Sequence, residues 1–90
     1  MPTAPQKPVV VYCTTFCPYC VRVKTLLTKR GYAFEEIDVS GDADKRAWLI
    51  AETGGRRTVP VVFVDGVHIG GYDETAALDR TGELDRLIRG

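Results

Sequence analysis

The spacing of apolar residues changes along the chain, and each change predicts an element of secondary structure. Positions 9–12 hold four consecutive apolar residues, three of them valine, as in a buried strand. Residues 18–30 carry apolar side chains on one helical face, and Gly31 follows as a helix stop. Residues 34–39 alternate apolar with acidic side chains, which is typical of a strand. A right-handed crossover through the helix would place the two strands parallel.

A second helix and a hairpin are expected further along the chain. Asp42 is a candidate N-cap for a helix that ends before the glycines at 54–55. Residues 59–64 form an apolar run that predicts a strand, despite the proline near its start. The Asp-Gly pair at 65–66 is a strong type I′ turn signal, so residues 67–69 should return beside that strand.

The last third of the chain is predicted to be helical. The glycines at 70–71 break the return strand, and a helix is expected over residues 73–80. Gly82 interrupts it, and residues 83–89 form a last helical segment. The resulting order, βαβ followed by ββα, predicts an α/β fold in which helices cover a mixed sheet.

Composition and charge limit the function classes. The 90 residues make one domain, and Lys plus Arg balance Asp plus Glu at 12 each, so no charge pattern indicates a nucleic-acid partner. We expect residues 1–7 to be a disordered leader, because three prolines and no apolar run occur in the first eight residues. Residues 8–90 should form the folded domain. We therefore expect a cytoplasmic monomer that binds neither nucleic acid nor membrane.

Two cysteines, Cys17 and Cys20, lie two residues apart where the first strand gives way to a helix. Pro18 suits the first helical position, because the N–H that it lacks would have no intrahelical partner there. Cys17 then becomes the N-cap, where a backbone N–H and the helix dipole stabilise a thiolate. Cys20 is close enough to form a disulfide with Cys17. In a reducing cytosol such a pair is catalytic or metal-binding, and we interpret it as a thiol–disulfide exchange site.

A zinc site is the alternative interpretation of this pair. Zinc commonly takes four ligands, and the chain offers three cysteines and one histidine, namely Cys13, Cys17, Cys20 and His68. Cys13 and His68 lie within predicted strands and not on the loops that usually supply zinc ligands, so we favour redox chemistry without a metal. Cys13 fits a buried small apolar side chain, and a regulatory third thiol is the other interpretation.

Pro60 stands near the start of the run 59–64, where a proline is suited to the first residue of a strand. A cis Val59–Pro60 bond would form a tight turn there. The N–H and C=O of Val59 would then be available to pair with an extended, peptide-like ligand. An ordinary proline at the start of a strand explains the same sequence equally well.

The segment Gly70-Gly71-Tyr72-Asp73 joins the return strand to the next helix. Its glycines let the backbone approach a ligand closely, and the N–H groups at the helix start can bind an anion. A plain strand-to-helix turn with Asp73 as the cap is the alternative.

Together, these segments resemble the motifs of dithiol glutaredoxins. The three motifs are Cys17-Pro18-Tyr19-Cys20, Thr58-Val59-Pro60 and Gly70-Gly71-Tyr72-Asp73, and the similarity covers residues 8–90. The resemblance implies an α/β, thioredoxin-like fold with a four-stranded mixed sheet flanked by helices. It also implies an enzyme that reduces protein–glutathione mixed disulfides and protein disulfides, with glutathione as co-substrate and with no bound cofactor or metal.

The resemblance further implies a role for each site residue. Cys17 would be the nucleophile and Cys20 the resolving thiol. The residues expected to bind glutathione are Tyr19, Thr58, Val59, Pro60, Gly71, Tyr72 and Asp73. The expected partners are glutathione and proteins that contain disulfides or are glutathionylated.

The sequence departs from the family pattern at Thr14, where many members carry a lysine that meets a glutathione carboxylate. Arg56 or Arg57 is the expected substitute. Tyr72 stands where many bacterial relatives have a cysteine. Two other functions are alternatives: a redoxin reduced by thioredoxin reductase, and a carrier of an iron–sulfur cluster held by Cys17 and glutathione. The intact glutathione motifs count against the first, and the second cysteine of the pair counts against the second.

Overall fold

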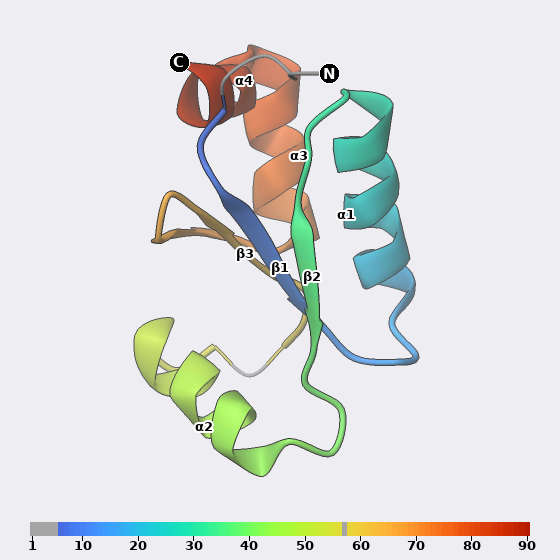
Figure 1. Cartoon of the computed structure of the whole chain (residues 1–90), viewed down its shortest axis with the longest axis vertical. Helices are drawn as coiled ribbons and strands as arrows, with labels where there is room; N and C mark the ends of the chain where they lie inside the picture. Colours follow the sequence, from blue (N-terminus) through green and yellow to red (C-terminus); the bar gives the residue numbers. More distant parts are fainter. Residues whose placement is uncertain (1–5, 57) are drawn as a thin grey trace.

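The computed structural model describes residues 6–56 and 58–90, and its elements follow the predicted order (Figure 1). In chain order they are β1 (Val9–Cys13), α1 (Pro18–Lys29), β2 (Glu35–Asp38), α2 (Ala43–Glu52), β3 (Val61–Val64), β4 (Val67–Gly70), α3 (Tyr72–Thr81) and α4 (Glu83–Arg89). The hydrophobic spacing therefore predicts the type of each element correctly, and only their ends shift by a residue or two.

The four strands form one mixed sheet in the order β2-β1-β3-β4. β1 and β2 are parallel, as predicted, and β3 runs antiparallel to both β1 and β4. Asp65 and Gly66 both have positive φ, 53° and 79°, which is the backbone of the predicted type I′ turn between β3 and β4. The predicted fold class, an α/β fold with a four-stranded mixed sheet flanked by helices, is confirmed.

Helices cover both faces of the sheet, so the inner strands bury side chains on both sides (Figure 1). Along β1, Val9, Val11 and Cys13 point to the face covered by α1, α3 and α4, which we call the closed face. Val10 and Tyr12 point to the face covered by α2, which we call the open face. Successive residues of β1 therefore belong to two different cores.

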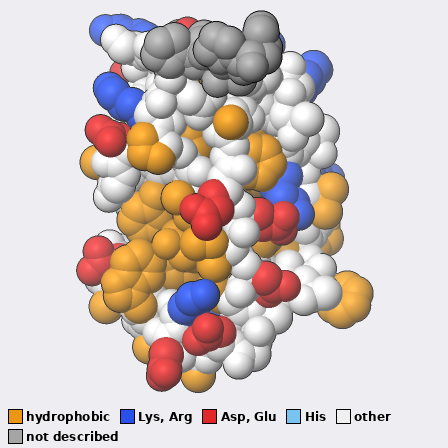
Figure 2. Space-filling model, in the orientation of Figure 1, with side chains coloured by type: hydrophobic (Ala, Val, Ile, Leu, Met, Phe, Trp, Pro, Cys, Tyr) orange, Lys and Arg blue, Asp and Glu red, His pale blue; other side chains and the backbone are white. Residues whose placement is uncertain are grey.

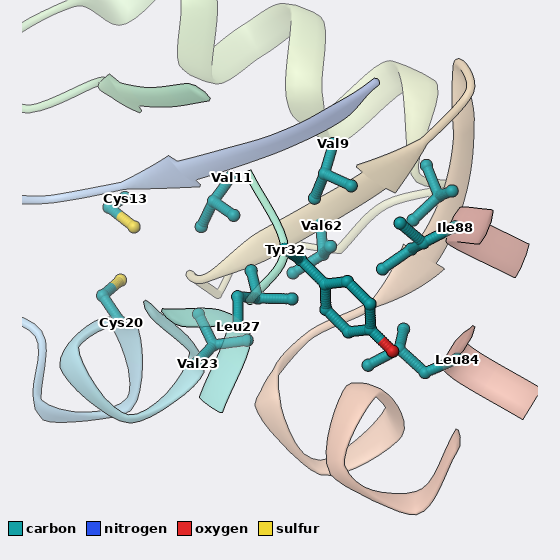
Figure 3. Packing of buried hydrophobic residues seen from close by; sticks show 11 residues of the cluster. Val9, Val11, Cys13, Cys20, Val23, Leu27, Tyr32, Val62, Leu84 and Ile88 are labelled. Atoms are coloured by element: carbon teal, nitrogen blue, oxygen red, sulfur yellow. The ribbon is translucent and has the colours of Figure 1, made fainter. Parts of the chain in front are cut away.

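The closed face holds the larger core. Its buried side chains come from β1, β3, α1, α4 and the turn after α1: Val9, Val11, Cys13, Cys20, Val23, Leu27, Tyr32, Val62, Val64, Leu84 and Ile88 (Figure 3). Burying one aliphatic side chain of this size contributes about 1.5–3 kcal/mol. Polar contacts reinforce it: the Tyr32 hydroxyl donates to Asp85 at 2.9 Å, and Arg30 donates twice to Asp79 at 2.9 Å. These contacts tie the C-terminal end of α1 to α3 and α4.

The open face holds a smaller core of four buried side chains: Val39, Leu49, Val61 and Phe63. Among the described helices it is α2 that covers this face, and Trp48 of α2 remains 45% exposed. The Trp48 ring lies 5.7 Å from that of Tyr12 and 6.0 Å from that of Phe63. Figure 2 shows apolar side chains gathered over a broad area on this side of the molecule. The open face is therefore only partly shielded from solvent.

The sequence predicts one helix start correctly and another wrongly. Asp42 caps α2, its carboxylate accepting a hydrogen bond at 3.0 Å from the backbone N–H three residues later. α3, however, begins at Tyr72 with Gly71 as the N-cap, so Asp73 is not the cap. The Glu74 carboxylate instead accepts from the Gly71 N–H at 2.6 Å. The longer Glu side chain reaches back to the helix start, which removes the need for an acidic cap at 73.

The predicted disordered leader, residues 1–7, lies largely outside the described residues. Its last two residues are described, and both bond to the folded body. The Gln6 side chain donates to the Ala33 carbonyl at 2.8 Å, and the Lys7 N–H donates to the Ile88 carbonyl at 2.7 Å. Gln6 and Lys7 are therefore part of the fold. Over the described ranges, each helix is too short or too polar to cross a membrane.

Candidate active site

Cys17 occupies the N-cap of α1, as predicted, with extended backbone (φ −146°, ψ 104°). Pro18 takes the first helical position. The Cys17 sulfur accepts a hydrogen bond from the backbone N–H of Cys20 at 3.2 Å. A sulfur in this position faces the unpaired N–H groups and the positive end of the helix dipole, which stabilise negative charge there. The first turn of α1 thus presents a half-buried sulfur suited to nucleophilic attack.

Cys20 lies on the inner side of the same turn and is only 2% exposed. Burial raises the pKa of its thiol far above the ordinary value, and hydrogen bonds with the Cys17 and Cys13 thiols raise it further. Cys13, at the end of β1, is 1% exposed, and burial raises its thiol pKa as well. Cys13 and Cys20 therefore remain protonated at neutral pH, and Cys17 is the thiol that solvent reaches.

Hydrogen bonds from the end of β2 hold the loop between β1 and α1. The Thr15 N–H donates to Ser40 Oγ at 2.8 Å, and the Thr15 hydroxyl donates to Asp38 Oδ2 at 3.2 Å. The Ser40 N–H donates to Asp38 Oδ1 at 2.7 Å, and this bond lowers the pKa of the Asp38 carboxyl. The carboxylate therefore stays ionised, as an acceptor, at neutral pH. The loop that presents Cys17 is fixed on the β2 side.

The Val59–Pro60 peptide bond is cis, which is the first of the two interpretations of Pro60, and β3 begins directly after it at Val61. The Val59 carbonyl oxygen lies 3.6 Å from the Cys17 sulfur and accepts from its thiol. We expected both backbone groups of Val59 to be available to a ligand. The carbonyl becomes available to a ligand only when Cys17 has lost its proton, because the thiol donates to this carbonyl and a thiolate has no hydrogen to donate.

The start of α3 is arranged around the buried Gly71. Glu74 Oε1, which accepts from the Gly71 N–H, also lies 3.4 Å from the Arg56 guanidinium. The Gly71 hydrogen bond, helped by Arg56, lowers the pKa of the Glu74 carboxyl. A Cβ at position 71 would lie 3.1 Å from the Pro60 carbonyl oxygen and against the Arg56 guanidinium. Glycine is therefore required here for close packing between two segments of the site.

A groove of about 310 Å³ opens beside these segments. Its walls come from α1, from the chain before β3 and from the start of α3: Tyr19, Arg56, Thr58, Val59, Pro60, Tyr72 and Asp73. The Tyr19 and Tyr72 rings lie 5.9 Å apart. Arg56 and Asp73 contribute charges of opposite sign. Because Val59 lines the groove and its carbonyl also contacts Cys17, the groove lies next to the reactive sulfur.

The structure brings together most of the residues that the sequence singles out. Among those expected to bind glutathione, Gly71 alone lies behind the groove, where it packs against Pro60. Arg56, considered as a substitute for a lysine at Thr14, lines the groove, and Arg57 lies outside the described residues. Glu74 was missed, although the spacing of a glutamate three residues after the N-cap is a known helix-start signal.

The described part of the chain includes all three cysteines and His68. It contains no group of three or more His, Cys, Asp or Glu side chains arranged to hold a metal ion. The site instead offers one accessible sulfur, one buried partner sulfur and an adjacent groove. This arrangement can carry out thiol–disulfide exchange.

The chain is similar in sequence to known proteins of one family. A family model described as Glutaredoxin matches residues 9–69. The chain is 46% identical over 88 residues to Glutaredoxin-C6 of Oryza sativa subsp. japonica. The aligned region covers 96% of this chain and 79% of that protein.

Solved structures agree with the sequence match. A glutaredoxin from Brucella melitensis is similar with a TM-score of 0.84 and 39% identity, over 99% of this chain and 95% of that one. A buckwheat glutaredoxin–glutathione complex gives a TM-score of 0.82 and 39% identity, over 90% and 76% of the two chains. With its sheet, its paired cysteines and these relatives, the chain belongs to the glutaredoxins, thiol–disulfide oxidoreductases of thioredoxin-like fold.

Proposed function

We propose that this protein uses glutathione to reduce two kinds of substrate, protein–glutathione mixed disulfides and disulfides within proteins. The observation that carries the proposal is the Cys17 sulfur at the N-cap of α1, bonded to the Cys20 N–H and adjacent to a groove with charges of both signs. Glutathione is a short peptide with two carboxylates and one ammonium group. The buckwheat relative, whose structure is a complex with glutathione, supports the choice of ligand.

Each part of glutathione has a proposed partner in the groove. Thr58 and Val59 pair with its cysteinyl backbone as an added strand would, next to Pro60. The backbone N–H groups of Tyr72 and Asp73, in the first turn of α3, meet the γ-glutamyl carboxylate, since the Gly71 N–H is already bonded to Glu74. The Asp73 carboxylate meets the γ-glutamyl ammonium.

The remaining end of glutathione is its glycine carboxylate, for which Arg56 is the proposed partner. Tyr19 forms the wall nearest α1. In this arrangement the glutathione sulfur faces Cys17.

The proposed reaction begins with attack by Cys17. Its thiolate attacks the glutathione sulfur of a mixed disulfide, the bond to the protein sulfur breaks, and the protein thiolate leaves and takes a proton from water. Cys17 now carries glutathione. A second glutathione thiolate attacks that glutathione sulfur, which forms glutathione disulfide and returns Cys17 to the thiolate. In sum, one protein thiol is released and one glutathione thiol is consumed, because the disulfide bond passes from the protein–glutathione pair to a pair of glutathiones.

Disulfides within proteins require Cys20. Cys17 attacks one sulfur of the substrate and forms a mixed disulfide with it. Cys20 then loses its proton and attacks the Cys17 sulfur, which releases the substrate dithiol and leaves a Cys17–Cys20 disulfide. Two glutathione molecules reduce that disulfide, which the glutathione pool favours at a glutaredoxin potential of about −200 to −230 mV.

The proposed cycle also bears on where the protein works. Two catalytic thiols that are recharged by glutathione require a compartment in which glutathione is kept reduced. We therefore propose a cytoplasmic location and a role in electron transfer between glutathione and protein thiols, as part of cell redox homeostasis.

The test is a pair of serine variants measured on two substrates, with glutathione, glutathione reductase and NADPH as the electron supply. Cys17→Ser should abolish reduction of both a glutathionylated peptide and a peptide with an internal disulfide. Cys20→Ser should keep the first activity and lose the second. Thr28→Ser, on the exposed side of α1, is the matched control and should keep both.

Two results would contradict the proposal. One is an equal loss of both activities in both cysteine variants. The other is reduction that proceeds with thioredoxin reductase but not with glutathione, which would favour the alternative electron donor.

A further inference from the structure

The three cysteines form a row at the N-terminal end of α1. The Cys20 thiol has hydrogen bonds with both Cys17 and Cys13, so it is the middle member. Cys13 has Cys20 as its hydrogen-bond partner. Figure 3 shows the Cys13 and Cys20 sulfurs pointing toward one another across the space between β1 and α1. Cys20 therefore has a sulfur neighbour on each side.

The proposed catalytic cycle makes no use of Cys13. The alternation of β1 places its side chain on the closed face, with Val9 and Val11, where any small apolar side chain would serve packing. A thiol at this place brings additional chemistry, because it lies next to the sulfur that becomes part of a disulfide in every turnover on a protein disulfide. With 1% exposure, Cys13 is reached by Cys20 and not by solvent.

We propose that Cys13 is a third redox-active thiol, which accepts the disulfide from Cys17–Cys20 and forms a buried Cys13–Cys20 disulfide. The proposal rests on the proposed dithiol cycle, because it starts from the Cys17–Cys20 disulfide.

The exchange is balanced within the protein. The Cys13 thiol gives up its proton and its sulfur attacks the Cys20 sulfur. The bond between Cys20 and Cys17 breaks, and its electron pair leaves on Cys17. The proton goes to water or to the Cys17 thiolate. One S–S bond replaces another, so no additional oxidant or reductant is needed.

Two features of the site favour this exchange. The leaving group is the Cys17 sulfur, and the helix start stabilises its negative charge; good leaving thiols accelerate exchange. The attacking Cys13 thiol is protonated most of the time, because burial raises its pKa, but its thiolate is correspondingly the stronger nucleophile. The product is an oxidised protein with a free Cys17, able to react with glutathione mixed disulfides while Cys20 is withheld from protein disulfides.

Disulfide mapping of the wild-type protein tests this directly. The protein is oxidised with glutathione disulfide, quenched in acid, and its free thiols are blocked with N-ethylmaleimide after unfolding. Trypsin leaves all three cysteines on one peptide, whereas chymotrypsin cleaves after Tyr12, Phe16 and Tyr19 and separates them. Mass spectrometry of the linked peptides then identifies each pair.

The outcomes separate this proposal from the proposed function. A Cys13–Cys20 link, with either N-ethylmaleimide or glutathione on Cys17, is the expected result. A Cys17–Cys20 link alone, with Cys13 always blocked, would overturn the third-thiol proposal and leave the dithiol cycle intact. Cys17 bound only to glutathione, with no internal link, would overturn both.

A variant supplies a second, independent measurement. Iodoacetamide applied to the folded, oxidised wild type should label Cys17 in the fraction that holds the Cys13–Cys20 disulfide. The oxidised Cys13→Ala variant should show no label, because its Cys17 stays in the disulfide with Cys20. Reduced samples of both, each labelled once at Cys17, control for folding. Equal labelling of the two oxidised proteins would contradict the proposal.

Discussion

The two faces of the sheet differ in how much apolar surface they bury. The closed face joins α1 and α4 to the sheet through eleven buried side chains, and polar contacts tie the end of α1 to α3 and α4. The open face has four buried side chains and a half-exposed Trp48. The groove takes Arg56, Thr58 and Val59 from the chain that follows α2, on the open side. Most of the stability thus comes from one face, while ligand contacts come from a segment at the edge of the other.

The largest difference should appear when one buried leucine on each face is shortened. Replacing Leu27, which is fully buried in α1, with Ala should lower the free energy of unfolding by about 2–5 kcal/mol. Leu49→Ala in α2 should cost about 2 kcal/mol or less, because half-exposed neighbours close the gap more easily. Urea denaturation of both variants in the presence of a reductant measures these losses. Equal losses would show that the faces do not differ as described.

High pH should weaken the closed face through its thiols. Burial raises the folded-state pKa of Cys13 and Cys20, whereas in the unfolded chain both titrate near ~8.5. As pH rises, the unfolded chain loses its thiol protons before the folded chain does. The two buried thiols therefore contribute fully to the free energy of unfolding below about pH 8.5, and this contribution declines above that pH. The decline is at most ~1.4 kcal/mol per pH unit for each thiol.

The free energy of unfolding between about pH 7 and about pH 9.5 measures this decline, with a phosphine to keep the thiols reduced. Cys13→Ala should have a shallower slope than the wild type, because one buried thiol is gone. Identical slopes in the two proteins would contradict the assignment of the alkaline effect to the buried pair.

Each face has a tyrosine, so the faces can be compared by removing one hydroxyl group from each. Tyr32→Phe on the closed face loses the hydrogen bond to Asp85 and should destabilise the fold by about 1 kcal/mol. Tyr12→Phe on the open face should change stability very little, because the described residues offer its hydroxyl no hydrogen bond. Thermal or urea unfolding compares them. The comparison fails if Tyr12→Phe costs as much as Tyr32→Phe.

The smallest effect should be seen in catalysis and not in stability. Arg56 is about one-third exposed, at 31%, so its ion pair with a glutathione carboxylate should contribute about 0.2–1 kcal/mol. Arg56→Gln should therefore raise the KM for glutathione up to about fivefold, leave kcat unchanged and leave unfolding nearly unchanged. Arg56→Lys keeps the charge and is the matched control. An unchanged KM in Arg56→Gln, at low salt, would remove Arg56 from the glutathione site.

The sequence predicts those features that depend on near neighbours in the chain. Cys17 and Pro18 define a helix start by themselves, because the missing N–H of proline and the capping sulfur act within one turn. The continuous apolar run at residues 9–12 likewise indicates a buried strand. The wrong start of α3 shows the limit: Asp73 has the right residue type for a cap, but the longer Glu74 reaches the Gly71 N–H.

Contacts that depend on packing could not be predicted from the sequence. Cys13 and Cys20 are seven positions apart, on a strand and a helix, and no local rule relates their side chains. They meet because α1 lies across β1 with its first turn over the end of the strand (Figure 3). The contact between Cys17 and the Val59 carbonyl is likewise a result of how β3 and α1 are placed.

The N-cap of α1 has a consequence for the dynamics of the helix. At its C-terminal end the Arg89 side chain donates to the Arg30 and Gly31 carbonyls, at 3.5 Å and 3.2 Å, and neither contact involves a redox-active group. At its N-terminal end the cap is the reacting sulfur of Cys17. A sulfur in a disulfide is a poorer acceptor than a thiolate, so each oxidation loosens the cap and each reduction restores it. Amide hydrogen exchange in the first turn of α1 should therefore follow the redox state, while exchange in its last turn stays constant.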